Sequence, residues 1–164
     1  MSGELEILVF KEGALAAVGH DLKLRGTCAV TVDRTARTVR AIVDASSLRV
    51  VAAQRDGRDD PAALSASDRA KIEASTRDDV LEARRHPQIV FEGRWVGDAP
   101  ADVEGTLALH GRSLPLRLVV RADGDHVVAE ATLRQSAFGI TPFRALLGAL
   151  RVQDGVRVRW SGTP

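Results

Sequence analysis

The sequence predicts a mainly β domain, and two observations carry that prediction. Apolar residues alternate with polar ones in several short runs, of which 114–120, 127–133 and 156–160 are the clearest. Alternation at a period of two gives each strand one dry face and one wet face, as in half-buried antiparallel strands. The second observation is a single helix-compatible stretch between these runs. A lone sheet must hide its apolar face, and closing into a barrel is one way to do so.

Length and composition fit one globular domain over residues 1–164, with 45% hydrophobic and 27% charged residues. A net charge of +1 and 4% aromatic residues argue against a nucleic-acid-binding surface. No stretch reaches the roughly 18 apolar residues that a membrane-spanning helix needs. The opening MSGELEILVF has no basic region and no long apolar run, so we expect no secretory signal and a cytoplasmic location.

Turn signals divide the N-terminal part into strands. Lys-Glu-Gly at 11–13 and Asp-Arg-Thr-Ala at 33–36 are the main breaks, and Gly26 marks a bend within a long strand. The charged run 54–61 has no apolar anchor and is predicted to be a loop. The predicted strands of this part are 4–10, 14–18, 22–32 and 39–45.

The stretch 67–84 is the predicted helical insertion, read as one helix or two short ones. Its apolar stripe is incomplete, and His86-Pro87 ends it because the residue before proline leaves the α region. Strands resume at 89–95, and the Gly-Asp turn signals at 97–98 and 123–125 predict hairpins. The apolar segment 143–150 is predicted to be a short helix over one barrel end, or an exposed patch that binds a partner.

The sequence predicts no enzyme. It lacks GxSxG, a P-loop, GxGxxG, HExxH and paired CxxC motifs. His20-Asp21 is the most suggestive pair, because a carboxylate beside a histidine can support proton transfer. The competing interpretation is that both side chains satisfy backbone groups where two strands cross. His110, in the hairpin 107–115, is interpreted as structural rather than catalytic.

No metal ion, cofactor or disulfide is predicted. The four histidines stand at 20, 86, 110 and 126, and none lies two or four residues from another. A metal site would therefore depend entirely on the fold. Cys28 is the single cysteine and is interpreted as a small buried hydrophobe within a strand.

Four segments carry a family resemblance: GALAAVGHDLKLRGTCAVTVD (13–33), ARRHPQIVFEG (83–93), VEGTLALHGRSLPLRL (103–118) and FGITPFRALLGALRVQDGVRV (138–158). In order, they resemble the opening hairpin with its histidine, the proline-then-strand element, the hairpin leading to a proline, and the closing strands of the YceI-like family. The resemblance implies an eight-stranded antiparallel lipocalin-like barrel with an elongated apolar cavity. In that fold, about 67–84 is the helical insertion and about 143–150 a short C-terminal helical or loop segment.

We therefore expect non-enzymatic binding of a long-chain amphiphilic or isoprenoid-like lipid inside the barrel. Small residues on the strand faces favour a cavity over a filled core; they are Ala41, Ala45, Gly93, Gly105, Ala129 and Ala131. The predicted lining residues are Leu22, Leu24, Val30, Phe91, Leu107, Leu116, Phe138 and Phe143. Two alternatives stay open: an interaction module that forms a homodimer through 143–150, and an enzyme that uses His20 and Asp21 in the barrel pocket.

Overall fold

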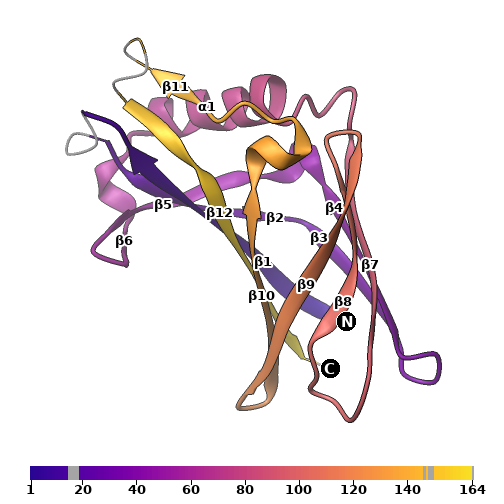
Figure 1. The fold of residues 1–164 in the computed structure, drawn as a ribbon. Helices are drawn as coiled ribbons and strands as arrows, with labels where there is room; N and C mark the ends of the chain where they lie inside the picture. Colours follow the sequence, from indigo (N-terminus) through magenta and orange to yellow (C-terminus); the bar gives the residue numbers. More distant parts are fainter. Residues whose placement is uncertain (15–18, 146, 148–149, 164) are drawn as a thin grey trace.

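The computed structural model describes residues 1–14, 19–145, 147 and 150–163, and most of them lie in antiparallel strands (Figure 1). One α-helix, α1 (Ala66–Ser75), runs directly into a π-helical turn, Thr76–Val80. The strands are β1 (Ser2–Glu12), β2 (Asp21–Gly26), β3 (Cys28–Asp33), β4 (Thr38–Asp44), β5 (Arg49–Arg55), β6 (Arg58–Asp60), β7 (Gln88–Trp95), β8 (Val103–Leu109), β9 (Arg112–Asp123), β10 (His126–Arg134), β11 (Arg144–Ala145) and β12 (Leu150–Thr163).

These strands form one sheet that curls into a half-barrel. Its hydrogen-bonded order is β3-β4-β7-β8-β9-β10-β12-β1-β2-β5-β6, and β11 pairs with β12 at the side. β1 and β12 come from opposite ends of the chain and pair from Ser2–Thr163 to Glu12–Arg151. The N-terminal end of β1 also lies against β3, where the Met1 amino group donates to the Val30 carbonyl at 3.0 Å. β3, which begins this order, therefore lies against β1, a strand from the middle of the sheet.

The predicted number of eight strands was wrong. Eleven strands lie along the path in the described residues, partly because the predicted strand 22–32 is divided by a corner. β2 and β3 are separated by Thr27 alone, and a 3-10 turn at Ala45–Ser47 separates β4 from β5. The two corners are joined, because the Thr27 amide donates to Ser47 Oγ at 2.8 Å. Gly26 permits this packing, since a Cβ there would lie 2.6 Å from Leu48 Cδ2.

The helical insertion covers one end of the half-barrel, at the top of Figure 1. Its helix begins after Ser65, whose Oγ accepts from the Asp68 amide at 3.0 Å and so caps the first turn. Two side chains of α1 bind the backbone of β5: Glu73 accepts from the Val50 amide at 2.8 Å, and Arg69 donates to the Val51 carbonyl at 3.1 Å. The described part of the insertion thus holds one α-helix, and its helical backbone ends at Val80 rather than at residue 84.

Two predicted segments differ from the structure. The charged run 54–61 is not a plain loop, because β5 and β6 pair across the left-handed residues Asp56 and Gly57. An Asp-Gly pair is a hairpin signal that holds even where apolar residues are lacking. In 143–150, the prediction of a short helix or loop was wrong at Arg144–Ala145, which pair with β12 as β11. Residues 146, 148 and 149 of that segment, and 15–18 of the predicted strand 14–18, lie outside the described residues.

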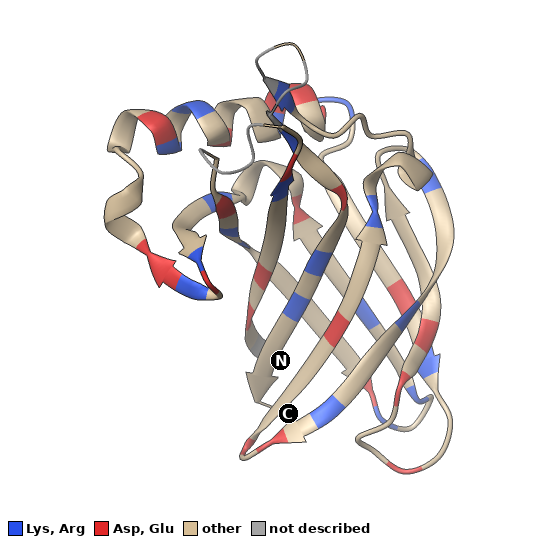
Figure 2. Cartoon of the chain, turned by 60° about the vertical axis from the view of Figure 1, so that its left-hand side comes forward, with Lys and Arg blue, Asp and Glu red and all other residues tan. Residues whose placement is uncertain are grey.

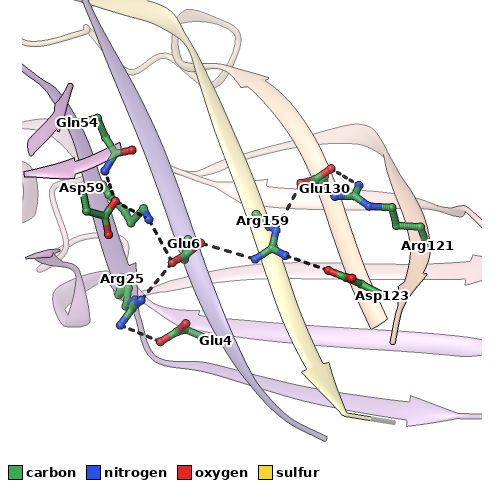
Figure 3. Close-up of polar contacts among 10 residues, drawn as sticks. Glu4, Glu6, Arg25, Gln54, Asp59, Arg121, Asp123, Glu130 and Arg159 are labelled. Atoms are coloured by element: carbon green, nitrogen blue, oxygen red, sulfur yellow. Dashed lines mark hydrogen bonds and ion pairs between the residues drawn. The ribbon is translucent and has the colours of Figure 1, made fainter. Parts of the chain in front are cut away.

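Charged residues recur along the strands of the half-barrel (Figure 2). Glu6 on β1 is the centre of one cross-strand group, with Lys23, Arg25 and Arg159 at 3.8, 3.2 and 3.8 Å (Figure 3). Arg159 in turn reaches Glu130 at 3.5 Å. A single exposed ion pair contributes little to stability, but this group ties β2, β1, β12 and β10 together on the wet face.

Two facing glycines on β7 and β8 hold the ring of Phe91 against the sheet. A Cβ on Gly93 or on Gly105 would lie 2.8 Å from Phe91 Cζ, and one on Gly105 would lie 2.2 Å from the Glu92 carbonyl oxygen. The two glycines are cross-strand partners. Phe91 is 6% exposed, so its burial depends on this gap.

We predict that Gly105→Ala destabilises the protein by about 1–3 kcal/mol, because the new methyl group meets backbone and the Phe91 ring. Gly155→Ala is the matched control: the nearest atom to its Cβ is Thr132 Cγ2 at 3.9 Å. The control should change the free energy of unfolding by less than about 0.5 kcal/mol. Urea denaturation of both variants measures the difference, and equal effects would contradict this account of the two glycines.

Candidate functional site

The curled sheet encloses a cavity of about 1340 Å³. Its wall is built from alternate residues of neighbouring strands, with Leu5, Ile7 and Val9 from β1 and Val156 and Val158 from β12. Glu6 and Arg157, which alternate with these wall residues, carry charges and do not line the cavity. On these strands, the apolar residues of the alternating pattern form the cavity wall, and the residues between them lie on the opposite face of the sheet.

The cavity runs along most of the half-barrel. On β12 its apolar lining extends from Val152 to Trp160, which is roughly 26 Å of extended chain at the usual rise per residue. Barrel strands tilt by about 35–45°, so the length along the barrel axis is about 20 Å. α1 closes part of one end through Ile72, and the π-helical turn adds Val80.

Charged residues of the lining lie at the two ends, while the wall between them is mainly apolar. The end nearest α1 carries Lys11, His20, Lys71 and Arg151. The opposite end is formed by the β3–β4, β7–β8 and β9–β10 connections and carries Arg34, Arg37, Asp98, Asp125 and His126. A ligand with an apolar body and a polar end therefore meets matching surroundings only when its polar end lies at a rim.

Seven of the eight predicted lining residues face this cavity: Leu22, Leu24, Val30, Phe91, Leu107, Leu116 and Phe143. The eighth, Phe138, is 4% exposed and packs in the apolar core instead of the cavity wall. It belongs to the 3-10 turn Gln135–Phe138 after β10, where the regular alternation has ended. Which of these residues touch a ligand stays a prediction.

Some lining residues had no signal in the sequence. Leu64 and Ile72 reach the cavity only because the helical insertion folds over the end of the barrel. Of the small residues thought to leave room, Ala41, Ala129 and Ala131 do line the cavity. Ala45 is buried elsewhere in the core. Gly93 and Gly105 serve a different purpose, because the Phe91 ring occupies the space beside them.

The pair His20-Asp21 is divided between two roles. His20 is exposed and lies on the rim of the cavity. The Asp21 carboxylate accepts from the Lys11 backbone amide at 2.8 Å and so joins the start of β2 to the end of β1. For Asp21, this matches the interpretation that the side chain satisfies a backbone group where two strands cross; for His20 that interpretation stays a prediction.

Cys28 is half-buried and lines the cavity. Burial raises the pKa of its thiol above the ordinary value, so the less reactive protonated form is favoured at neutral pH. The thiol therefore serves as part of the wall.

A second polar group lies near the end closed by the helical insertion. The fold brings His110, from the turn between β8 and β9, close to Glu82 and His86, which are four residues apart in the sequence. His110 Nε2 lies 2.7 Å from Glu82 Oε2, and the His86 and His110 ring centroids are 4.8 Å apart. The four-residue spacing of Glu82 and His86 was a signal in the sequence, whereas no local pattern joins His110 to them.

Asp154 on β12 holds the 3-10 turn Gln135–Phe138, which leads to the cavity residue Ile140. Its two carboxylate oxygens accept from the Ser136 amide at 2.7 Å and the Ser136 hydroxyl at 2.6 Å. Arg134 adds a contact at 3.2 Å. The hydrogen bonds from Ser136 hold the pKa of Asp154 below its ordinary value, with Arg134 as a smaller cause.

Residues 11–163 match the YceI-like domain family. The chain belongs to the YceI-like family. No helix in the described residues is both long and apolar enough to cross a membrane. A comparison with curated proteins gives no match.

Two solved structures share the fold of this YceI-like protein. BcnA of Burkholderia cenocepacia superimposes with a TM-score of 0.61 at 14% identity, over 98% of this chain and 96% of that one. A polyisoprenoid-binding domain from Saccharophagus degradans, implicated in plant cell wall breakdown, also gives a TM-score of 0.61 at 14% identity. That match covers 99% of this chain and 94% of the other. At such low identity the likeness concerns the fold alone.

We predict that Asp154→Asn weakens folding at neutral pH and that its effect disappears in acid. Because the folded-state pKa of Asp154 is lowered, its stabilisation is complete above the unfolded value of about 3.9 and is lost as the pH falls through the folded value. Urea unfolding of the parent and the variant between pH 7 and pH 3 measures the difference. A gap that stays constant down to pH 3 would contradict the assignment.

Proposed function

We propose that this YceI-like protein binds a long-chain amphiphilic or isoprenoid-like lipid inside its cavity and catalyses no reaction on it. The observation that carries the proposal is the cavity of about 1340 Å³ with a mainly apolar wall and charges at its ends. It exceeds the roughly 300–1,000 Å³ typical of small-molecule pockets. The similar domain from Saccharophagus degradans is described as binding polyisoprenoids, which supports the same class of ligand.

The length of the cavity favours an extended ligand. One acyl chain spans about half of a bilayer core, or about 15 Å. The lined part of β12, Val152 to Trp160, allows about 20 Å along the barrel axis. A single long chain therefore fits with its polar end at a rim.

Burial of apolar surface is the main source of affinity. Transfer of about 300 Å² of apolar ligand surface from water contributes roughly 7 kcal/mol before the costs of association. Emptying the cavity of water adds to the gain, because the wall offers solvent few hydrogen-bond partners. Micromolar binding corresponds to about 8 kcal/mol after those costs, so a larger buried chain surface or a polar contact at the rim supplies the remainder.

The enzyme alternative has little support at His20-Asp21, because the carboxylate of Asp21 is engaged by the Lys11 amide. The interaction alternative rests on exposed apolar side chains beside the cavity mouth: Phe143 is 46% exposed and Leu147 is fully exposed. A homodimer through this segment is compatible with lipid binding and stays a prediction. Sedimentation at two protein concentrations tests it, and a monomer at both would remove it.

We predict that Ala129→Trp lowers lipid uptake at least tenfold, because the indole projects into the cavity that Ala129 lines. Thr132→Trp is the matched control. Thr132 is exposed on the same strand, so this substitution places an indole on the solvent side of the sheet instead of in the cavity. The probe is a fluorescent 16-carbon fatty acid, with a polyprenyl alcohol as competitor. Thermal unfolding verifies that both variants are folded.

Cys28 offers a second readout of the same proposal. Because its thiol lines the cavity, a bound lipid should slow its modification by N-ethylmaleimide in the parent protein. Unchanged labelling in the presence of saturating lipid, or equal lipid uptake by the two tryptophan variants, would show that the ligand binds elsewhere. Native mass spectrometry of protein from its own host identifies the natural ligand.

A further inference from the structure

Three side chains with metal-binding chemistry converge outside the lipid cavity. Glu82 follows the helical insertion, His86 precedes β7, and His110 stands in the turn between β8 and β9. One ligand atom from each lies within 4.8 Å of the others. Two imidazoles and one carboxylate are a donor set that zinc sites use when a fourth position is left for water.

Both ring nitrogens of His110 face oxygen acceptors. Nδ1 lies 3.3 Å from the Phe138 carbonyl, and Nε2 lies 2.7 Å from Glu82 Oε2. A neutral imidazole carries one N–H, so only one of these contacts can be a hydrogen bond. If Nδ1–H donates to Phe138, the lone pair of Nε2 points at a carboxylate oxygen. A cation between Nε2 and Oε2 resolves this conflict, and the bond to Phe138 then fixes the tautomer as in many metal sites.

The backbone around the cluster is arranged to hold it. Glu82 and His110 both have left-handed conformations, with φ values of 46° and 52°, which non-glycine residues rarely adopt. The Glu82 carbonyl accepts from the His86 amide at 3.0 Å, which keeps these two side chains near each other. A Cβ on Gly111 would lie 3.0 Å from His86 Cε1, so the glycine leaves room for that ring. Such uncommon backbone conformations gather at functional sites.

The second carboxylate oxygen of Glu82 is already engaged. Oε1 accepts from Arg85 Nη1 at 2.8 Å, and Oε2 remains directed at His110. The hydrogen bond from Arg85 is the main cause, and the contact with His110 the next, that holds the pKa of Glu82 below its ordinary value. The carboxylate is therefore ionised at neutral pH. Side-chain exposure is 14% for His110 and 33% for Glu82, which allows a metal ion to enter from solvent.

We propose that Glu82, His86 and His110 form a binding site for a divalent transition-metal ion, with Zn²⁺ as the preferred ion. Glu82 Oε2 and His110 Nε2 are two of the ligands, and a ring nitrogen of His86 is the third. Zinc bonds of about 2.0–2.1 Å place tetrahedral ligands about 3.4 Å apart. The present 2.7 Å contact therefore widens slightly, and the His86 ring moves inward. The bound ion would link the end of the helical insertion to the β8–β9 turn.

The test is calorimetric titration of the chelator-treated protein with Zn²⁺ alone. We expect one ion per chain and a loss of affinity of at least tenfold in His86→Ala and in Glu82→Gln. Glu82→Gln keeps the size of the side chain and an oxygen near His110, so it removes chiefly the negative charge. His126→Ala is the matched control, because His126 is exposed at the opposite end of the barrel.

Thermal unfolding without metal shows whether each variant is folded, and the rise in midpoint temperature on adding Zn²⁺ gives a second readout of binding. The parent and His126→Ala should show the rise, while His86→Ala and Glu82→Gln should not. No Zn²⁺ binding by the parent would overturn the proposal. Equal losses in His86→Ala and His126→Ala would also overturn it, because binding would then be spread over surface histidines.

Discussion

The pairing of β1 with β12 is the constraint on which the rest of the structure depends. These strands come from the two ends of the chain and pair along nearly their whole length. Without this contact the order β3-β4-β7-β8-β9-β10-β12 would end in an open edge, and the apolar face would lie in water. The pairing also brings the Val156 and Val158 side chains beside Ile7 and Val9, so that the cavity wall is continuous. Closing such distant segments is costly in chain entropy, and the many backbone hydrogen bonds of the ladder offset that cost.

A protein with a large cavity cannot rely on a packed centre in the way that an ordinary domain does. Here close packing lies at a corner, where Leu48 covers Gly26, within β7 and β8, where Phe91 covers the paired glycines, and at the turn held by Asp154. Along the strands the wet face contributes through cross-strand charges centred on Glu6 (Figure 3). Backbone hydrogen bonds between strands and side-chain contacts on the outer face therefore stabilise the wall. The inner face is left free to accept different apolar ligands.

The sequence predicted the parts of this arrangement that depend on local pattern. Alternation identified the strands and which residues face inward, and Asp-Gly signals marked the β9–β10 hairpin. The sequence pattern could not show that Thr27 divides one strand into two, because that corner depends on contacts with Ser47 and Leu48 from a distant segment. Phe138 was misplaced because alternation carries no information within a 3-10 turn. The cluster of Glu82, His86 and His110 was missed because a contact between residues of two separate turns leaves no periodic pattern in the sequence.

The volume of the cavity has a mechanical consequence. When a protein unfolds, its internal voids are filled by solvent, and the total volume of protein and water decreases. An apolar space of about 1340 Å³ that solvent fills poorly makes the folded, unliganded chain the bulkier state. Hydrostatic pressure therefore acts against this fold more strongly than against a solid domain of equal length. A lipid that occupies the space removes most of that compressible volume, so the loaded protein behaves under pressure as if its interior were packed.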